Sequence, residues 1–346
     1  MNARTGFLER VALPSLQGLP VQVPMADKAP VHVEGFARPF SPALTFTPFA
    51  SVRPCSGRCI FCSETLQHRQ QKRMSASLRP GPRYFHQLQC ALHDLRILPM
   101  GLSLSGLEQT DDADFFEGIM DSIVAHRQSG GCIRDVVLYS NGAGLARSTT
   151  GARLVPRLAE VTRVELSRHS NLQSRNDAIM RFRPEVSVAK QAAFEEVVRD
   201  AHAFAHVRLV CVVQHGGVDD ARTLMSYLRW AANLGVKDVV FRELSRLGDT
   251  YRANRTLRLV EERRVGIEGL FEGVHQELEL HHVVDGYYYW NVACAFEDMR
   301  VTFEVADYIQ MKKEHASDVV QKLVFHADGT LGADWDPDRE VLKRYA

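Results

Sequence analysis

The chain has 346 residues, 45% of them hydrophobic, which is enough to bury a sizeable core in one large domain with extensions or in two domains. Lysine plus arginine and aspartate plus glutamate both number 42, so the formal net charge is zero and bulk binding to nucleic acid is not expected. No apolar run approaches the roughly 18 residues of a membrane span, and the mixed polar start of the chain predicts no signal peptide. Seven cysteines, three of them clustered, do not indicate a disulfide framework, so we expect a protein of the reducing cytoplasm that binds no membrane.

An N-terminal arm is expected over residues 1–44. This segment is rich in proline, lacks helical periodicity and holds short β-prone pieces at 21–23 and 31–33, which favour edge strands on a sheet. The composition also fits a disordered leader, and both interpretations stay open.

A core of alternating strands and helices is expected over residues 45–250. The patterns predict strands at 43–49, 101–105, 134–139, 163–167, 207–213 and 236–243, and helices at 82–95, 115–126, 149–158, 187–202 and 221–234. Six β/α units in a row predict an α/β fold whose parallel sheet carries helices on the outside. Crossovers of one hand would curl such a sheet toward a barrel.

The tail, residues 251–346, has a different pattern. It is helical from 256 toward 280 and then offers short strands at 287–290, 300–304, 322–326 and 330–334, with a turn signal at Asp328-Gly329. We expect a small antiparallel C-terminal extension that closes one side of the barrel.

Three cysteines lie in the loop after the first core strand. Cys55, Cys59 and Cys62 are spaced C-x3-C-x2-C, and thiolates are soft ligands that suit iron–sulfur clusters. They would fill three corners of a four-iron cluster and leave one iron open for a small chelating ligand. A zinc loop with a distant fourth ligand and three unrelated cysteines are the alternatives. Zinc sites usually come as paired C-x2-C units, however, and the other four cysteines are scattered.

At this spacing the chain resembles the radical SAM superfamily. The resemblance covers residues 45–250 and implies a partial (β/α)6 barrel, a [4Fe–4S] cluster and S-adenosylmethionine bound at the open iron. It further implies reductive cleavage of that cosubstrate to a 5′-deoxyadenosyl radical, with electrons from an external donor of the flavodoxin or ferredoxin type. Phe61, just before the third cysteine, matches the family position that helps to cover the adenine.

Two further motifs follow strands. The stretch Ser105-Gly106-Leu107-Glu108-Gln109 resembles the family's Gly-Gly-Glu-Pro motif, which holds the amino group of S-adenosylmethionine. Leu107 replaces the second glycine and Gln109 the proline, which puts the backbone part of that contact in doubt, whereas Glu108 keeps the carboxylate that suits an ammonium. Asn141, in Ser-Asn-Gly after the third strand, resembles the family's Thr-Asn-Gly. Ordinary turns are the alternative for both stretches.

The remaining candidates follow later strands, because active sites in such barrels lie at the carboxyl ends of the strands. By resemblance, Ser167 is the candidate for the ribose, Gln214 for the ribose or carboxylate, and the backbone of Leu244 for the adenine. Arg168 and Arg242 are candidates for contact with an anionic group of the cosubstrate or substrate. For the two arginines, a solvated loop position and a structural ion pair are the respective alternatives.

The sequence therefore predicts a radical SAM enzyme that abstracts hydrogen from a small biosynthetic substrate such as a sugar, nucleoside or amino acid. Modification of a ribosomal peptide or protein side chain is the alternative, although no leader-binding domain and no second cysteine-rich cluster domain is evident. A non-enzymatic protein that keeps the cluster as a redox sensor is the rival from another class.

Overall fold

A computed structural model of the chain describes residues 13–24, 29–66, 78–247, 253–286, 288–315 and 318–346. The strands are β1 (Val21–Gln22), β2 (Phe40–Phe49), β3 (Met100–Leu104), β4 (Ile133–Ser140), β5 (Arg163–Ser167), β6 (His206–Val213), β7 (Asp238–Glu243), β8 (Glu279–Asp285), β9 (Tyr289–Phe296), β10 (Met299–Ala306), β11 (Val320–His326), β12 (Thr330–Gly332) and β13 (Val341–Arg344). The α-helices are α3 (Tyr84–Asp94), α4 (Ala113–Gln128), α5 (Ser148–Arg157), α6 (Gln173–Met180), α7 (Gln191–His202), α8 (Ala221–Asn233), α9 (Arg255–Arg263), α10 (Ile267–Glu272) and α11 (Tyr308–His315). Short 3-10 turns lie at Pro14–Leu16, Ser63–Leu66, Gln109–Asp111, Leu158–Glu160, Ser187–Ala189 and His275–Glu277.

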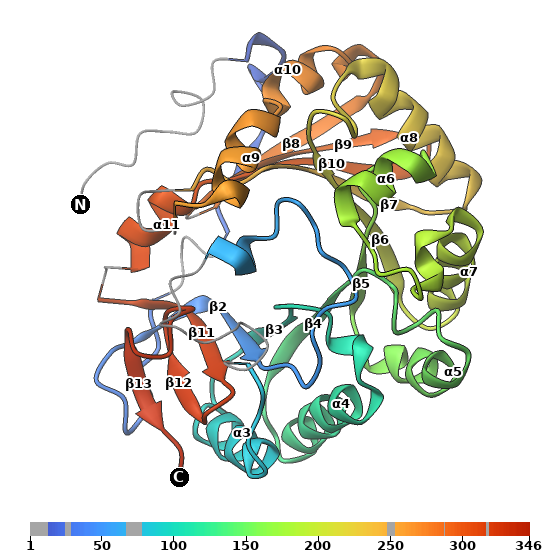
Figure 1. Cartoon of the computed structure of the whole chain (residues 1–346). Helices are drawn as coiled ribbons and strands as arrows, with labels where there is room; N and C mark the ends of the chain where they lie inside the picture. The colour runs from blue at the N-terminus through green and yellow to red at the C-terminus, as the bar shows by residue number, and fades with distance from the viewer. Residues whose placement is uncertain (1–12, 25–28, 67–77, 248–252, 287, 316–317) are drawn as a thin grey trace.

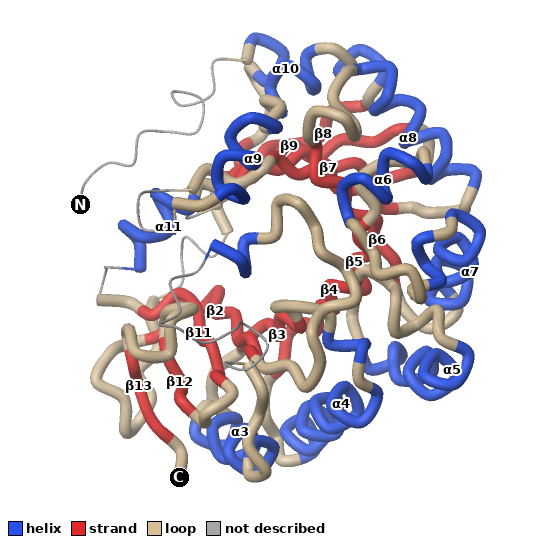
Figure 2. The backbone as a smooth tube through the Cα atoms, viewed as in Figure 1, coloured by secondary structure: helices blue, strands red, loops and turns tan. Residues whose placement is uncertain are grey.

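All the described strands belong to one sheet, in the order β1-β8-β9-β10-β7-β6-β5-β4-β3-β2-β11-β12-β13. Along the run β10-β7-β6-β5-β4-β3-β2-β11, each strand pairs in parallel with the next. The pairs β8–β9, β9–β10, β11–β12 and β12–β13 are antiparallel. The sheet curls around the centre of the molecule, with α3, α4, α5, α7 and α8 on its outside (Figures 1 and 2). Its edge strands β1 and β13 do not pair with each other, so the described sheet is an open, partial barrel.

The main core lies between the outer face of the sheet and the helices. Along β5, Val164 and Leu166 are fully buried and belong to this core, as does Leu138 on the neighbouring β4. Alternate residues of a strand face opposite sides, so the other set along each strand faces the inside of the curled sheet. Local caps fix where the helices start: the Asp112 carboxylate accepts a hydrogen bond from the Phe115 N–H at the start of α4.

The six predicted core strands are confirmed as β2 to β7, and the predicted helices between them are confirmed as α3, α4, α5, α7 and α8. Helix α6 was missed because its sequence is mostly polar and offers little helical periodicity. The arm, the core and the tail each contribute strands to this one sheet. The division of the chain at 1–44, 45–250 and 251–346 stays a prediction.

The predicted antiparallel pairs of the tail are present, and they extend both edges of the core sheet. That the tail closes one side of the barrel stays a prediction. Strand β10 continues the sheet in parallel beside β7, and β11 does so beside β2. The tail therefore belongs to the same sheet as the core. Among the described residues, no helix is long and apolar enough to span a membrane.

Candidate active site

The three predicted cluster cysteines lie together in the loop that follows β2. Cys55, Cys59 and Cys62 are half-buried, and none of them is in a disulfide. The loop is held by the end of α6, where the Met180 carbonyl accepts from the Arg58 N–H at 2.9 Å and the Ile179 carbonyl accepts from the Ile60 N–H at 3.0 Å. The apolar side chains of Ile60, Ile179 and Met180 pack together beneath these hydrogen bonds. The helix that the sequence pattern missed therefore fixes the loop's position.

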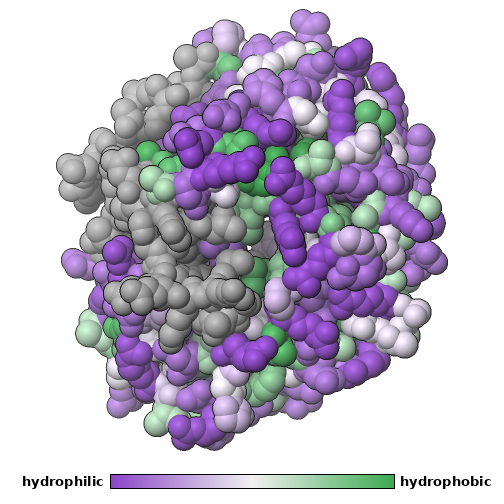
Figure 3. Space-filling model, viewed as in Figure 1, coloured by the Kyte–Doolittle hydropathy of each residue, from purple (hydrophilic) through white to green (hydrophobic). Residues whose placement is uncertain are grey.

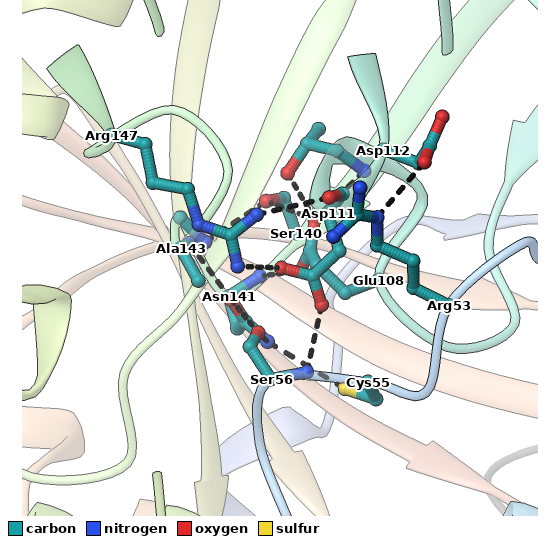
Figure 4. A network of polar contacts seen from close by, with 12 residues as sticks. Arg53, Cys55, Ser56, Glu108, Asp111, Asp112, Ser140, Asn141, Ala143 and Arg147 are labelled. Carbon is teal, nitrogen blue, oxygen red and sulfur yellow. Dashed lines mark hydrogen bonds and ion pairs between the residues drawn. The ribbon is translucent and has the colours of Figure 1, made fainter. Parts of the chain in front are cut away.

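An acidic side chain anchors the other side of the loop (Figure 4). The Asp111 carboxylate accepts from the Ser56 N–H at 2.7 Å and from the Arg147 guanidinium at 3.0 Å. Burial raises the pKa of Asp111, and Arg147 works against that rise by stabilising the charged form. Asp111 and Ser56 were not among the predicted site residues. The available signal in the sequence was an acidic residue three positions after Glu108.

Glu108 lies at the centre of the network in Figure 4 and is 3% exposed. Its Oε1 accepts from the Thr110 N–H and hydroxyl and from the Ser140 hydroxyl, and its Oε2 accepts from the Asn141 N–H at 2.6 Å. Burial and the nearby Asp111 charge raise the pKa of Glu108. A carboxylate oxygen can accept about two hydrogen bonds, so Oε2 keeps capacity for one further donor.

Asn141 connects this network to the cysteines. Its Nδ2 donates to the Ser56 hydroxyl at 3.0 Å and lies 3.7 Å from the Cys55 sulfur, within reach of a weak hydrogen bond. Its Oδ1 accepts from the Ala143 N–H, which fixes the orientation of the amide. The structure thus brings Glu108, Asn141 and the cysteine loop together.

The two departures from the Gly-Gly-Glu-Pro pattern leave the backbone in a glycine-like conformation. Gly106 and Leu107 have φ angles of 88° and 57°, so Leu107 occupies the left-handed region that a glycine would favour. The Leu107 side chain packs against a small buried cluster that includes Phe49 and Val324, which offsets part of the conformational cost. The Gln109 amide donates to the Pro48 carbonyl at 3.1 Å and to the Ser105 carbonyl at 3.4 Å.

Comparison with family models finds no match, and no curated protein matches the sequence. Solved structures do match. SuiB from Streptococcus suis, bound to the precursor peptide SuiA, aligns with a TM-score of 0.50 at 12% identity, over 88% of this chain and 62% of that one. Native anSMEcpe with bound AdoMet aligns with a TM-score of 0.43 at 16% identity, over 57% of this chain and 50% of that one. TsrM from Kitasatospora setae, with cobalamin and a [4Fe-4S] cluster bound, aligns with a TM-score of 0.41 at 11% identity, over 57% of this chain and 36% of that one.

The chain has the radical SAM fold. The alignment with SuiB supports this statement, because it reaches a TM-score of 0.50 and includes most of the chain. The matched part amounts to about half of the anSMEcpe chain and 62% of the SuiB chain, so both relatives are considerably longer than the region they share with this protein.

Within this radical SAM fold, Phe61 packs edge-on against the buried His169 ring, with 5.0 Å between the ring centroids. The Nδ1 of His169 accepts from the Val212 N–H, so the proton of the neutral ring is on Nε2. Burial, together with the cations of Arg168 and Arg242, lowers the pKa of His169 to about 3. The His169 ring is therefore neutral and held in one orientation beside Phe61.

The other strand-end candidates are placed as follows. Ser167 shares the inner face of β5 with Glu165 and is half-buried. Gln214 is fully buried, its Nε2 donates to the Val212 carbonyl, and its Oε1 accepts no hydrogen bond from any described residue. Leu244 is buried, and its carbonyl, the atom expected to meet the adenine, accepts from Arg264 Nε at 3.0 Å.

The two arginine candidates differ. Arg168 is 0% exposed and lies on the outer face of β5 with Leu166, where its guanidinium donates to the Val188 carbonyl and to Gln191 and stacks on Phe194. These contacts with the protein's own residues do not support the expectation that Arg168 meets cosubstrate or substrate. Side chains two residues apart on an extended chain lie on the same face. The apolar residue type of Leu166 was therefore the available sign, in the sequence, that Arg168 faces the core.

Arg242 faces inward, where its Nε donates to Glu304 at 2.5 Å and its guanidinium lies 3.9 Å from Glu165. It also lines a cavity of about 790 Å³ that lies inside the curled sheet, the size of a small-molecule site. The cavity walls are rich in hydroxyl, phenol and charged groups, which come from Thr45, Thr47, Ser63, Glu64, Ser103, Ser105, Tyr139, Asp285, Tyr288, Tyr289, Glu304, Tyr308 and Lys322 among others. Figure 3 shows green side chains gathered around a hollow near the centre of the face in view.

The donor set suits an iron–sulfur cluster. Three thiols come from one loop, none is in a disulfide, and the Asn141 amide N–H lies beside one of the sulfurs. Hydrogen bonds to sulfur are one of the levers by which a protein tunes such a cluster. Among the described residues, no group of three or more His, Cys, Asp or Glu side chains is placed to hold a single metal ion, and this includes the three loop thiols.

Proposed function

We propose that this chain binds a [4Fe–4S] cluster through Cys55, Cys59 and Cys62, cleaves S-adenosylmethionine reductively and abstracts hydrogen from a small biosynthetic substrate. One observation carries the proposal: the three thiols lie in a single loop that is tied through Ser56 and Asn141 to the Glu108 network at the strand ends. The radical SAM fold agrees with this arrangement.

The cluster would pass one electron from an external flavodoxin- or ferredoxin-type donor to the sulfonium, so that methionine leaves and the 5′-deoxyadenosyl radical takes a hydrogen atom from the substrate. The protein's part is to hold, orient and shield the reactants. Glu108 Oε2 would accept from the cosubstrate ammonium, and Ser105 and Gly106 would bring backbone close to it. Phe61 would cover the adenine, with His169 fixing its ring.

Further along the sheet, Ser167 on the inner face of β5 would reach the ribose, and the Gln214 Oε1 that lacks a donor would accept from a ribose hydroxyl. Leu244 would contribute packing under the adenine, because its carbonyl already accepts from Arg264. Arg242 would border the substrate, with its charge balanced by Glu304.

A small substrate is favoured because the cavity is about 790 Å³ and lies among barrel strands. Radical modification of a ribosomal peptide is the second candidate, and the likeness to SuiB, which is bound to its precursor peptide, favours it. The cavity size and that likeness point in different directions, so the two candidates are best separated by experiment.

The deciding experiment is anaerobic reconstitution with iron and sulfide, followed by reduction in the presence of S-adenosylmethionine. We expect 5′-deoxyadenosine from the wild type and none when the three loop cysteines are changed to alanine. Cys132→Ala, at an exposed cysteine outside the loop, is the matched control and should keep the activity. A wild type that holds a cluster yet forms no 5′-deoxyadenosine would contradict the proposal and favour a redox sensor.

The substrate class follows from deuterium transfer. Cells that naturally make this protein are labelled with deuterium, and their small-molecule and peptide fractions are supplied separately to the reduced enzyme. Deuterium in 5′-deoxyadenosine from the small-molecule fraction would support the first candidate, and deuterium from the peptide fraction alone would support the second.

A further inference from the structure

Lys322 on β11 is a buried ammonium that lines the cavity, and none of the described residues is a hydrogen-bonding partner of its Nζ. It is 9% exposed, and its Nζ lies 3.5 Å from the centroid of the Trp335 ring. Among the residues that the structure describes, none accepts a hydrogen bond from Nζ or forms an ion pair with it. An ammonium carries three donors, and an aromatic face satisfies none of them fully.

The charged groups around Lys322 do not neutralise it by direct contact. Asp334 and Glu64 act on it from a distance and favour its charged form, but burial outweighs them and lowers the pKa of Lys322 to about 7. The other described cation that lines the cavity, Arg242, already donates to Glu304. Two described cations line the cavity, Arg242 and Lys322. Of these two, Lys322 is the one that has no acceptor within hydrogen-bonding distance among the described residues.

Hydroxyl groups of the neighbouring strand lie next to Lys322. Strand β11 pairs in parallel with β2, and the register places Lys322 beside Thr45 and Val324 beside Thr47. Both threonines line the same cavity, two residues apart on one strand and therefore on one face. An ammonium with two nearby hydroxyl donors is a donor set that suits an anionic oxygen group.

Burying an unpaired ammonium is unfavourable, because the water that solvated it is lost and no protein acceptor replaces it. A ligand that brings an anion to Nζ removes that cost, whereas a neutral ligand does not. We propose that Lys322, with Trp335, Thr45 and Thr47, forms the end of the cavity that binds a carboxylate or phosphate group of the substrate. This inference rests on the proposed function, in which the cavity receives the substrate, and it specifies that substrate as an anion.

The first test is chemical protection of Lys322 in the reconstituted full-length protein. The amine is acetylated at neutral pH and the modified fraction of each lysine is measured by mass spectrometry. Lys343, which pairs with Asp94 outside the cavity, is the internal control. The probes are acetylglycine and its uncharged amide, which differ in the anionic charge, and methyl phosphate, which distinguishes a phosphate site from a carboxylate site.

We expect acetylglycine or methyl phosphate to slow acetylation of Lys322 several-fold relative to Lys343, with the stronger of the two identifying the preferred anion. The amide should have no such effect. Equal protection by acid and amide, or no selective protection of Lys322 by either anion, would overturn the proposal.

The second test follows tryptophan fluorescence during titration with the anion that protects best. Lys322→Met keeps the length of the side chain without its charge and should weaken binding about ten- to a hundredfold, the loss expected for a charge-assisted contact. Lys322→Arg should restore part of it, and Lys190→Met, at an exposed lysine, should bind like the wild type. Unchanged binding in Lys322→Met would refute the site, and if that variant does not fold, the protection experiment on the wild type decides.

Both tests are independent of turnover. Protection of Lys322 without formation of 5′-deoxyadenosine would mean that the anion site stands and the proposed function fails. Formation of 5′-deoxyadenosine without selective protection would mean that the function stands and the anion site fails.

Discussion

Replacing Glu108 with glutamine separates its proposed contact with S-adenosylmethionine from its structural role. The carboxylate accepts four hydrogen bonds from its own chain, so Glu108→Ala would leave buried donors of Thr110, Ser140 and Asn141 without a partner. Glutamine keeps one oxygen for Thr110 and Ser140. It loses the acceptor for the Asn141 N–H and the negative charge that would meet the ammonium.

The magnitudes follow from these contacts. One unsatisfied buried N–H costs about 1–3 kcal/mol of folding stability. Losing a charge-assisted contact to the cosubstrate ammonium costs about 1.5–3 kcal/mol of binding, which is roughly ten- to a hundredfold in affinity. The cluster should be retained, because the loop is held through Asp111 and α6 rather than through Glu108 itself.

The assay combines iron analysis, urea unfolding and calorimetric titration with S-adenosylmethionine on anaerobically reconstituted protein. Glu117→Gln, which removes a charge on the outer face of α4, is the control and should bind the cosubstrate like the wild type. Wild-type affinity in Glu108→Gln, with the cluster intact, would refute the reasoning. It would also show that Leu107 and Gln109 mark a real departure from the family motif.

Three further predictions follow. Reconstituted wild type should hold about four irons per chain and the triple loop-cysteine variant none, and a count near eight in the wild type would reveal a second cluster. His169, whose pKa falls from 6.5 to about 3 on folding, contributes stability that is present above pH 6.5 and is lost at about 1.4 kcal/mol per pH unit as the pH falls toward 3. His169→Gln should therefore flatten the dependence of unfolding free energy on pH below 6.5, measured by urea titration, and an unchanged slope would contradict this. Removal of residues 287–346 takes β10 and β11 out of the parallel sheet and should abolish a cooperative unfolding transition; a truncated chain that folds, holds its cluster and modifies substrate at the full rate would show that the tail is dispensable.

The strand predicted at 287–290 starts at Tyr287, which lies outside the described residues, and its last two residues, Tyr289 and Trp290, open β9. Tyr289 lines the cavity. Lys322 was not singled out, because a lysine in a short strand is usually a solvated residue.

The sequence by itself determined the features that are local. Each core strand and most of the helices follow from apolar periodicity, which neighbouring residues carry without reference to the rest of the chain. The cysteine loop and Glu108 were found for the same reason, because the chemistry of both is contained in a few consecutive residues.

Only the tertiary structure decided how distant segments meet. The tail strands β10 and β11 join opposite edges of the sheet, and no local pattern states which edge a strand will reach. The contacts from Asp111 to Ser56 and from α6 to the cysteine loop join residues far apart in sequence, as does the pairing of Lys322 with the Thr45 strand. Local patterning fixes elements because it depends on short-range sterics and burial, whereas partner choice depends on the free energy of the whole packed sheet.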